Sequence, residues 1–435
     1  MLYYSTRDTE RKHPFCLKDA AFLGLAPDGG LFMPERYPVV DMDKVRSLAD
    51  ESFAAMASYL ASLFFGEDAD AAVLDALVRD AFNFEVPLYE LADGLCTLQL
   101  FHGPTFAFKD FGGRFMGRMS SLLNRGGDPV IVLTATSGDT GSAVAHGFWN
   151  VDGVKVVILY PDGKVSDLQE AQMTTLGGNI FPLRVNGCFD DCQRLVKEMF
   201  SDAELRSRVR ITSANSINIL RWIPQSFYYF YGWSQWCKST SASRNAPDIV
   251  VPSGNYGNIT AAMLAWKTGM PVRRFIAGAN ANGVVPQFLD GAPYSPRPSV
   301  QTVANAMDVG APSNFERMMY LFDGDAAAVR SFVSGKSFSD AEIEAGIAEM
   351  YSHYGYVSDP HSAIGYLNYK YFDASGFWLS TAHAAKFSTV IERSIGICPE
   401  LPDAFKRIMT LPRISSPMEN DREALKAYVT ELSCK

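Results

Sequence analysis

One lysine lies in an unusually aromatic and glycine-rich part of the sequence. Lys109 belongs to the run HGPTFAFKDFGGR and has phenylalanines close by at positions 106, 108 and 111. Surroundings that exclude water lower the pKa of an amine, and only the neutral amine attacks a carbonyl carbon. Lys109 is therefore a candidate Schiff-base nucleophile. The alternative is a lysine whose ammonium group reaches water and pairs with the neighbouring Asp110.

Three segments join an expected strand to an expected helix through small, hydroxyl-bearing or glycine residues. They run from Thr134 to Ser142, from Pro252 to Asn258 and from Trp378 to Lys386. The first N–H groups of a helix lack partners within the helix and the helix dipole favours negative charge there, so each segment could hold an anion. Each is also compatible with an ordinary capped connection. Several such segments in one chain favour a phosphorylated ligand.

Two motifs that bind nucleotide phosphates are missing from the sequence. There is no G-x-x-x-x-G-K-[ST], and no clean G-x-G-x-x-G opens a helix with an acidic residue about 20 positions later. A nucleotide is therefore disfavoured as the phosphorylated ligand. A candidate amine together with several anion-binding segments instead fits a phosphorylated carbonyl cofactor, namely pyridoxal phosphate.

The composition is that of a folded protein with two or three compact units. The 435 residues include 47% hydrophobic and 20% charged side chains, close to the globular average. The net charge of −9 would repel the phosphates of a nucleic acid. Because no stretch reads as a signal peptide or a membrane span, we expect a cytoplasmic protein that binds neither nucleic acid nor membrane. The seven cysteines are irregularly spaced, so we expect free thiols and no metal site.

The hydrophobic pattern separates a mainly helical beginning from an α/β remainder. Amphipathic stretches at 42–64 and 71–84 indicate helices in an N-terminal cap. From Val130 onward, short β-branched runs alternate with helical segments, and this alternation is typical of parallel strands joined by helices. The clearest strands are VIVL at 130–133, VKVVILY at 154–160 and DIVV at 248–251. The sequence therefore predicts an α/β fold.

Six segments occur in the order and approximate spacing of the threonine synthases, and nearly the whole chain resembles that family. They are HGPTFAFKDFGGRFMG, TATSGDTGSAVAH, SANSINILR, VPSGNYGNIT, NAMDVGAPSN and STAHAAKF. The resemblance implies a two-lobed pyridoxal-phosphate enzyme of the tryptophan-synthase-β type (fold type II), with parallel-rich sheets flanked by helices. It implies an N-terminal cap over 1–95 and a catalytic region over 96–435. Within that region, a smaller lobe of about 112–212 is inserted into a larger lobe of about 96–111 and 213–435.

The resemblance also implies roles for individual residues around the cofactor. Lys109 matches the lysine that carries the cofactor as a Schiff base and moves protons, and Thr381 matches the residue that hydrogen-bonds the pyridine nitrogen. The loop whose backbone binds the cofactor phosphate matches Gly254, Asn255, Tyr256, Gly257 and Asn258. Asp139 stands where related enzymes often carry an Asn that contacts the cofactor's 3′-oxygen. Because a carboxylate cannot donate a hydrogen bond to a phenolate, the role of Asp139 is left open.

The implied reaction converts O-phospho-L-homoserine and water to L-threonine and phosphate, the last step of threonine biosynthesis, by a carbon–oxygen lyase acting on a phosphate. The loop that receives the substrate matches Thr136, Ser137 and Thr140. The cradle for the substrate's own phosphate matches Asn215, Ser216 and Arg221. Arginine suits that place because its fork of donors meets phosphate oxygens bidentately. We expect a monomer or a homodimer.

Other readings of the sequence remain open. A phospholyase or a dehydratase of the same fold type would release 2-oxobutyrate, and a β-replacement enzyme of that fold type is a further alternative. The phospholyase would share every group up to the last branch of the reaction, whereas the other two would have no need of a second phosphate site. A scaffold or sensor that binds a phosphorylated metabolite would have no need of Lys109. His102 and His383 could support the site, whereas the other histidines have no expected role.

Overall fold

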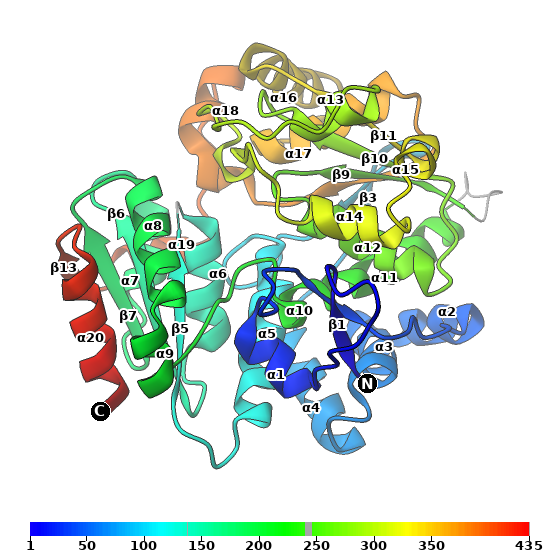
Figure 1. Ribbon diagram of the computed structural model, residues 1–435. Helices are drawn as coiled ribbons and strands as arrows, with labels where there is room; N and C mark the ends of the chain where they lie inside the picture. Colours follow the sequence, from blue (N-terminus) through cyan, green and yellow to red (C-terminus); the bar gives the residue numbers. More distant parts are fainter. Residues whose placement is uncertain (137, 240–245, 435) are drawn as a thin grey trace.

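The protein, described here by a computed structural model, is built from two lobes and an N-terminal cap (Figure 1). The structure describes residues 1–136, 138–239 and 246–434. Ser137, which the resemblance places in the substrate loop, lies outside the described residues. In the described part of the chain, no helix is long and apolar enough to cross a membrane.

The N-terminal cap is mainly helical, as the hydrophobic pattern predicts. Its elements are β1 (Tyr3–Ser5), α1 (Leu17–Leu23), β2 (Phe32–Pro34), α2 (Met42–Glu51), α3 (Phe53–Phe65) and α4 (Ala71–Ala81). Strands β1 and β2 pair antiparallel. The amphipathic stretch at 42–64 forms two helices because Ser52 ends α2 in extended backbone and caps α3 through its side chain. Phe53 and Phe65 of α3 pack against phenylalanines of the helix that begins at Lys109, and α4 also contacts that helix.

The larger lobe contains a sheet in the order β11-β10-β9-β12-β4-β3 among the described residues. Its strands are β3 (Leu88–Ala92), β4 (Leu95–Gln99), β9 (Asp248–Pro252), β10 (Arg274–Ala279), β11 (Val333–Ser337) and β12 (Gly376–Ser380). Every pairing except β3 with β4 is parallel. Successive residues of β9 face opposite cores: Ile249 faces the core of α11 (Gln225–Lys238) and α12 (Gly257–Lys267), and Val250 faces that of α16 (Asp340–Tyr354) and α17 (Pro360–Tyr371). Helices therefore cover both faces, which is why the central strands β9 and β12 are buried along their whole length.

The smaller lobe contains a fully parallel sheet in the order β13-β7-β6-β5-β8, again counted over the described residues. Its strands are β5 (Val130–Ala135), β6 (Val154–Pro161), β7 (Ile180–Val185), β8 (Arg210–Thr212) and β13 (Ser416–Met418). One face packs against α5 (Lys109–Leu123), α6 (Asp139–Phe148) and α7 (Asp167–Thr174). The other packs against α8 (Phe189–Ser201), α9 (Ala203–Arg208) and α20 (Arg422–Cys434).

The ends of the catalytic region differ from the limits expected from the resemblance. Strand β3 lies within the range expected for the cap, yet it pairs with β4 in the larger sheet. Strand β13 and helix α20 lie within the range expected for the larger lobe, yet β13 extends the smaller sheet at β7. Helix α20 lies against the smaller lobe (Figure 1), and its Leu425, Val429 and Leu432 belong to the core of that lobe. An apolar face in the sequence indicates that a helix will be buried, but it does not indicate against which sheet the helix will pack.

The connections between these elements contain short helices. They are α10 (Ile219–Trp222), α13 (Val284–Leu289), η1 (Asn305–Met307), α14 (Phe315–Leu321), α15 (Ala326–Phe332), η2 (Ala384–Phe387), α18 (Ser388–Ile395) and α19 (Asp403–Met409). Helix α17 begins at an Asp359 cap followed by Pro360, as its sequence favours. The cap also hydrogen-bonds His361, a histidine with no role expected from the sequence.

Glycines allow α5 and α6 to approach closely. A Cβ atom on Gly147 would lie 2.4 Å from the backbone of Gly113, and one on Gly117 would lie 2.1 Å from the carbonyl oxygen of Gly147. Because α5 begins at Lys109 and α6 begins at Asp139, this contact sets how close those two residues lie.

We predict that Gly147→Ala will separate the two helices and lower the free energy of unfolding by about 1–3 kcal/mol, because the obstacle is rigid backbone. Urea denaturation measures the change. Ser121→Ala, on the half-buried side of α5, is the control and should change the stability by less than about 0.5 kcal/mol. An equally stable Gly147→Ala protein would show that the helices can move apart freely.

Candidate functional site

The ends of three parallel strands of the larger sheet lie side by side. Strands β9, β12 and β4 are neighbours, and each pairs parallel with the next. Their carboxyl ends therefore meet at one edge, where open α/β sheets bind ligands. The loop to Lys109 follows β4, the loop at 253–257 follows β9, and the loop at 381–386 follows β12.

Two strands of the smaller sheet contribute from the other side. Strands β5 and β8 are parallel neighbours, so their carboxyl ends also coincide. The loop to Asp139 follows β5, and the segment from Ser213 to Arg221 follows β8. The residues assigned from the resemblance thus come from the ends of strands in both lobes, including segments far apart in the sequence.

Lys109 is the first residue of α5 and its side chain is half-buried. Burial lowers the pKa of Lys109 to about 8; the Asp139 carboxylate opposes this shift, and the positive charges of Arg221 and Lys386 add to it. The neighbouring Asp110 does not pair with it, because its carboxylate accepts hydrogen bonds from the backbone N–H and the hydroxyl of Thr105, at 2.9 and 2.7 Å. Lys109 therefore has the lowered proton affinity that a nucleophilic amine needs.

A short backbone bridge joins the segment before Lys109 to the loop after β12. The N–H of Phe108 donates to the carbonyl of Thr381 at 2.9 Å, and the N–H of His383 donates to the carbonyl of Phe106 at 3.1 Å. Phe106 has a φ of 54°, in the left-handed region that side chains other than glycine rarely adopt. Strain of this kind persists where the surrounding structure holds it, commonly at functional sites.

The loop at Gly254–Asn258 leads into α12 and has the geometry of an anion site. Among the described residues, none accepts a hydrogen bond from the backbone N–H groups of this loop. The loop is kept open by Tyr256, whose φ is 60°, and by Gly254, where a Cβ atom would lie 2.6 Å from the Cα of Met307. Free N–H groups at the start of an eleven-residue helix fit a phosphate group. This is one of the three segments predicted from the sequence to hold an anion.

The other two predicted anion segments are built differently. After β5, the hydroxyl of Thr136 accepts hydrogen bonds from the N–H groups of Gly138 and Gly141, both at 2.9 Å, so its role there is to shape the turn. After β12 the chain enters only the short 3-10 helix η2. Instead of a helix N-terminus, that loop supplies Thr381, which is buried and whose hydroxyl has no partner within the described ranges.

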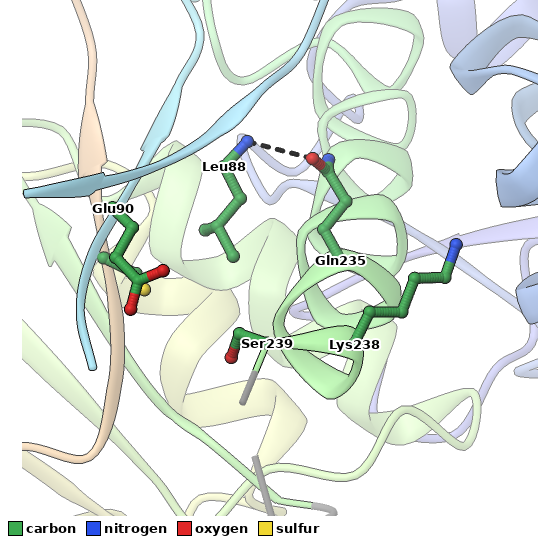
Figure 2. Close-up of a pocket in the computed structure, with 6 residues that line it drawn as sticks. Leu88, Glu90, Gln235, Lys238 and Ser239 are labelled. Carbon is green, nitrogen blue, oxygen red and sulfur yellow. Dashed lines mark hydrogen bonds between the residues drawn. The ribbon is translucent and has the colours of Figure 1, made fainter. Parts of the chain in front are cut away.

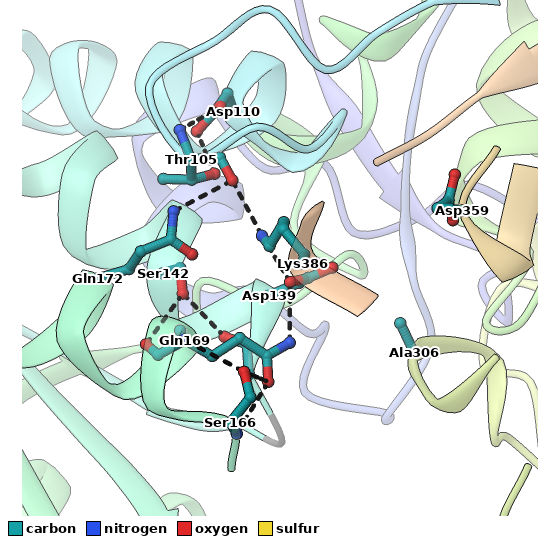
Figure 3. A network of polar contacts seen from close by, with 12 residues as sticks. Thr105, Asp110, Asp139, Ser142, Ser166, Gln169, Gln172, Ala306, Asp359 and Lys386 are labelled. Carbon is teal, nitrogen blue, oxygen red and sulfur yellow. Dashed lines mark hydrogen bonds and ion pairs between the residues drawn. The ribbon is translucent and has the colours of Figure 1, made fainter. Parts of the chain in front are cut away.

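Asp139 forms a buried ion pair that the sequence did not indicate. The Nζ atom of Lys386 lies 2.6 Å from Oδ1 of Asp139 and donates to the carbonyl of Thr105 at 2.9 Å (Figure 3). Burial alone would raise the pKa of Asp139, but the positive charges of Lys386 and Lys109 hold it below its usual value. Gln169 donates a further hydrogen bond to the same carboxylate at 3.1 Å. The only signal in the sequence was a lysine at the end of a loop of mostly small residues after a predicted strand.

Arg221 is a buried cation with no ion-pair partner among the described carboxylates. Its Nη1 donates to the carbonyl of Ala214, while its buried Nε has no acceptor in the described part of the chain. Burial lowers the pKa of Arg221 to about 10. Gly112 makes room for it, because a Cβ atom there would lie 2.8 Å from that Nε. A buried guanidinium without a counter-ion is unfavourable, so the arrangement favours an anionic ligand.

The remaining assigned residues lie around the same loops. Asn215 accepts a hydrogen bond from the hydroxyl of Thr134 at 3.3 Å. The hydroxyl of Ser216 accepts one from the side-chain amide of Asn255 at 2.8 Å, which ties the β8 segment to the phosphate loop. Thr140 is half-buried in the first turn of α6. These contacts bring the expected cradle and the expected cofactor loop together.

A separate cavity of about 260 Å³ lies away from this site. It is lined by Leu88, Glu90, Cys96, Gln235, Lys238 and Ser239 (Figure 2). It contains none of the residues assigned from the resemblance.

Comparisons with known proteins agree with this geometry. Residues 90–377 match the model of pyridoxal-phosphate dependent enzymes, residues 2–82 match that of the threonine synthase N terminus, and residues 367–429 match that of the threonine synthase C-terminal region. The threonine synthase of Haemophilus influenzae is 42% identical over 424 residues, covering 96% of this chain and 98% of the relative. That of Escherichia coli K12 is 40% identical, covering 98% of each chain.

Solved structures lead to the same family. The crystal structure of pyridoxal-phosphate-bound threonine synthase from Brucella melitensis has a TM-score of 0.93 and 33% identity, with all of both chains covered. The threonine synthase structure from Escherichia coli has a TM-score of 0.89 and 38% identity, covering 99% of this chain and 100% of that one. The fold is thus the α/β fold of type II pyridoxal-phosphate enzymes, and the chain belongs to the threonine synthase family, whose cofactor is pyridoxal phosphate.

Proposed function

We propose that the protein converts O-phospho-L-homoserine and water to L-threonine and phosphate. The observation that carries this proposal is one amine of lowered pKa, Lys109, beside two separate anion sites. One is the set of free N–H groups at 254–258 and the other is the unpaired guanidinium of Arg221. A phosphorylated cofactor and a phosphorylated substrate together require two phosphate sites, whereas a dehydratase substrate would bring no phosphate to Arg221.

The residues present fit pyridoxal phosphate. Lys109 would hold its carbonyl carbon, the N–H groups of 254–258 would bind its phosphate, and the free hydroxyl of Thr381 would meet its ring nitrogen. When bound, the cofactor withdraws electrons and so acidifies the substrate's α and β carbons. A neutral hydroxyl at the ring nitrogen, unlike a carboxylate, does not favour a proton there.

The chain's own groups then divide the work of the reaction. The neutral amine of Lys109 takes a proton from the substrate carbons and returns it, a task matched to a pKa near neutrality. Arg221 holds the substrate phosphate and stabilises the charge that develops on it as the bond between the γ carbon and the ester oxygen breaks. Asn215 and Ser216 orient the same phosphate, and water then adds at the β carbon. Cytoplasmic location and a monomeric or homodimeric state stay predictions from the sequence.

The product identifies the reaction directly. We expect the loaded enzyme, incubated with O-phospho-L-homoserine, to release threonine and phosphate in equal amounts, measured by amino-acid and phosphate analysis. Phosphate accompanied by 2-oxobutyrate would instead assign a phospholyase. An absence of turnover would contradict the substrate assignment.

Replacement of Arg221 tests the second anion site. We predict that Arg221→Met lowers kcat by about 10²–10³-fold, as loss of a donor to developing charge does elsewhere. The free energy of unfolding should not fall, because an apolar side chain removes a buried unpaired charge. Steady-state kinetics and urea denaturation measure the two effects, with the exposed Arg206→Met as the control. Unchanged activity would show that Arg221 does not hold the substrate phosphate.

The pH dependence of cofactor capture tests the amine. Because Lys109 reacts only when neutral and its pKa is lowered to about 8, the rate of capture by the cofactor-free protein should rise with pH and level off above about 8. Stopped-flow absorbance measures this rate. The rate of the same reaction with Nα-acetyl-lysine is the control, because it shows how the cofactor's own protonation changes the rate with pH. A rate that still climbs steeply above pH 9 would mean that Lys109 has an ordinary pKa.

A further inference from the structure

The proposed function leaves the most deeply buried ion pair of the site without a role. The side chain of Lys386 is fully buried, and that of Asp139 is 5% exposed. Burying both charges is costly unless their contact and the surrounding hydrogen bonds compensate for the lost water. An apolar pair of similar volume would often serve stability equally well, so stability alone does not explain the pair.

Lys386 is held in place from two directions. Its Nζ bridges Asp139, at the start of α6, and the carbonyl of Thr105, in the loop that precedes Lys109 (Figure 3). That carbonyl also accepts a hydrogen bond from Gln172 at 3.2 Å, and the N–H and hydroxyl of Thr105 are bound by Asp110. Lys386 thus links Asp139 to the loop that precedes Lys109.

Asp139 and Lys386 act on Lys109 in opposite senses. The carboxylate stabilises a positive charge on the Lys109 nitrogen, and the Lys386 ammonium destabilises it. Arg221 also faces Lys109 with a positive charge, while Asp110 stands beside it on the same helix. His361 also has an electrostatic effect on Asp139, smaller than that of Lys386 or Lys109. Among these groups, only Asp139 and Lys386 are in direct contact as a pair.

We propose that Lys386 is a positioning residue that compensates the charge of Asp139, so that the pair sets how firmly the Lys109 nitrogen holds its proton. The inference rests on the proposed function, because it assigns Lys109 as the residue that carries the cofactor. Lys386 pairs with Asp139 and contacts no reacting atom itself. It answers the question that the sequence left open, namely why a carboxylate stands at position 139.

The proposal is tested on the loaded enzyme by its absorbance as a function of pH, because the cofactor's absorbance reports the proton on the nitrogen that joins it to Lys109. Asp139→Asn keeps the size of the side chain but leaves the charge of Lys386 uncompensated. The pH at the midpoint of the absorbance change should therefore fall by about one unit, a tenfold change in proton affinity. Lys386→Met should raise the midpoint, because it leaves the Asp139 carboxylate uncompensated. In the double variant Asp139→Asn/Lys386→Met, the midpoint should return towards that of the wild type.

The double variant decides the outcome, because removing both charges should cancel the shift that Asp139→Asn produces alone. A double variant whose midpoint stays at that of Asp139→Asn, or the absence of a shift in every variant, would overturn the proposal. Lys155→Met is the matched control, since the Nζ atom of Lys155 also donates to a backbone carbonyl but lies far from the site. Lys109→Ala separates the two proposals: if it keeps the same pH-dependent absorbance, the role of Lys109 is wrong and the proposed function fails on its own.

Discussion

The parallel pairing of β9, β12 and β4 is the constraint on which the site depends. Parallel neighbours end at the same edge, so three loops that are distant in the sequence must lie side by side. Strands β5 and β8 repeat this arrangement in the smaller lobe. The glycine contact between α5 and α6 then keeps the first residues of the two helices, Lys109 and Asp139, within reach of each other.

The site carries mostly positive charge, whereas the chain as a whole has a negative net charge. The chain carries a net charge of −9, yet Lys109, Arg221 and Lys386 bring three basic groups to a buried region in which Asp139 is the paired carboxylate. Two phosphorylated ligands would supply the missing negative charge. Burial makes this arrangement effective, because a charge in a low-dielectric site acts on its neighbours far more strongly than it does in water.

The positive charges of the site have separate tasks because their environments differ. Lys109 has its proton affinity lowered by burial and can serve as nucleophile and base. Arg221 stays charged at neutral pH and is available to bind an anionic ligand. Lys386 is committed to Asp139 and Thr105, so it is unavailable to the ligand and instead adjusts the field at Lys109. A single change in this set therefore alters the others, which is the basis for comparing single and double variants.

Local sequence determined a large part of this protein. The strands at 130–133, 154–160 and 248–251, the cap of α17 and the turn leading into α12 are encoded by neighbouring residues, since propensity, capping and glycine geometry act over a few positions. Tertiary structure decided the partners: β13 joined the smaller sheet, Asp110 bound Thr105, and Lys386 met Thr105, 281 positions away in the sequence. Such pairings depend on how whole elements pack, and no local pattern carries that information.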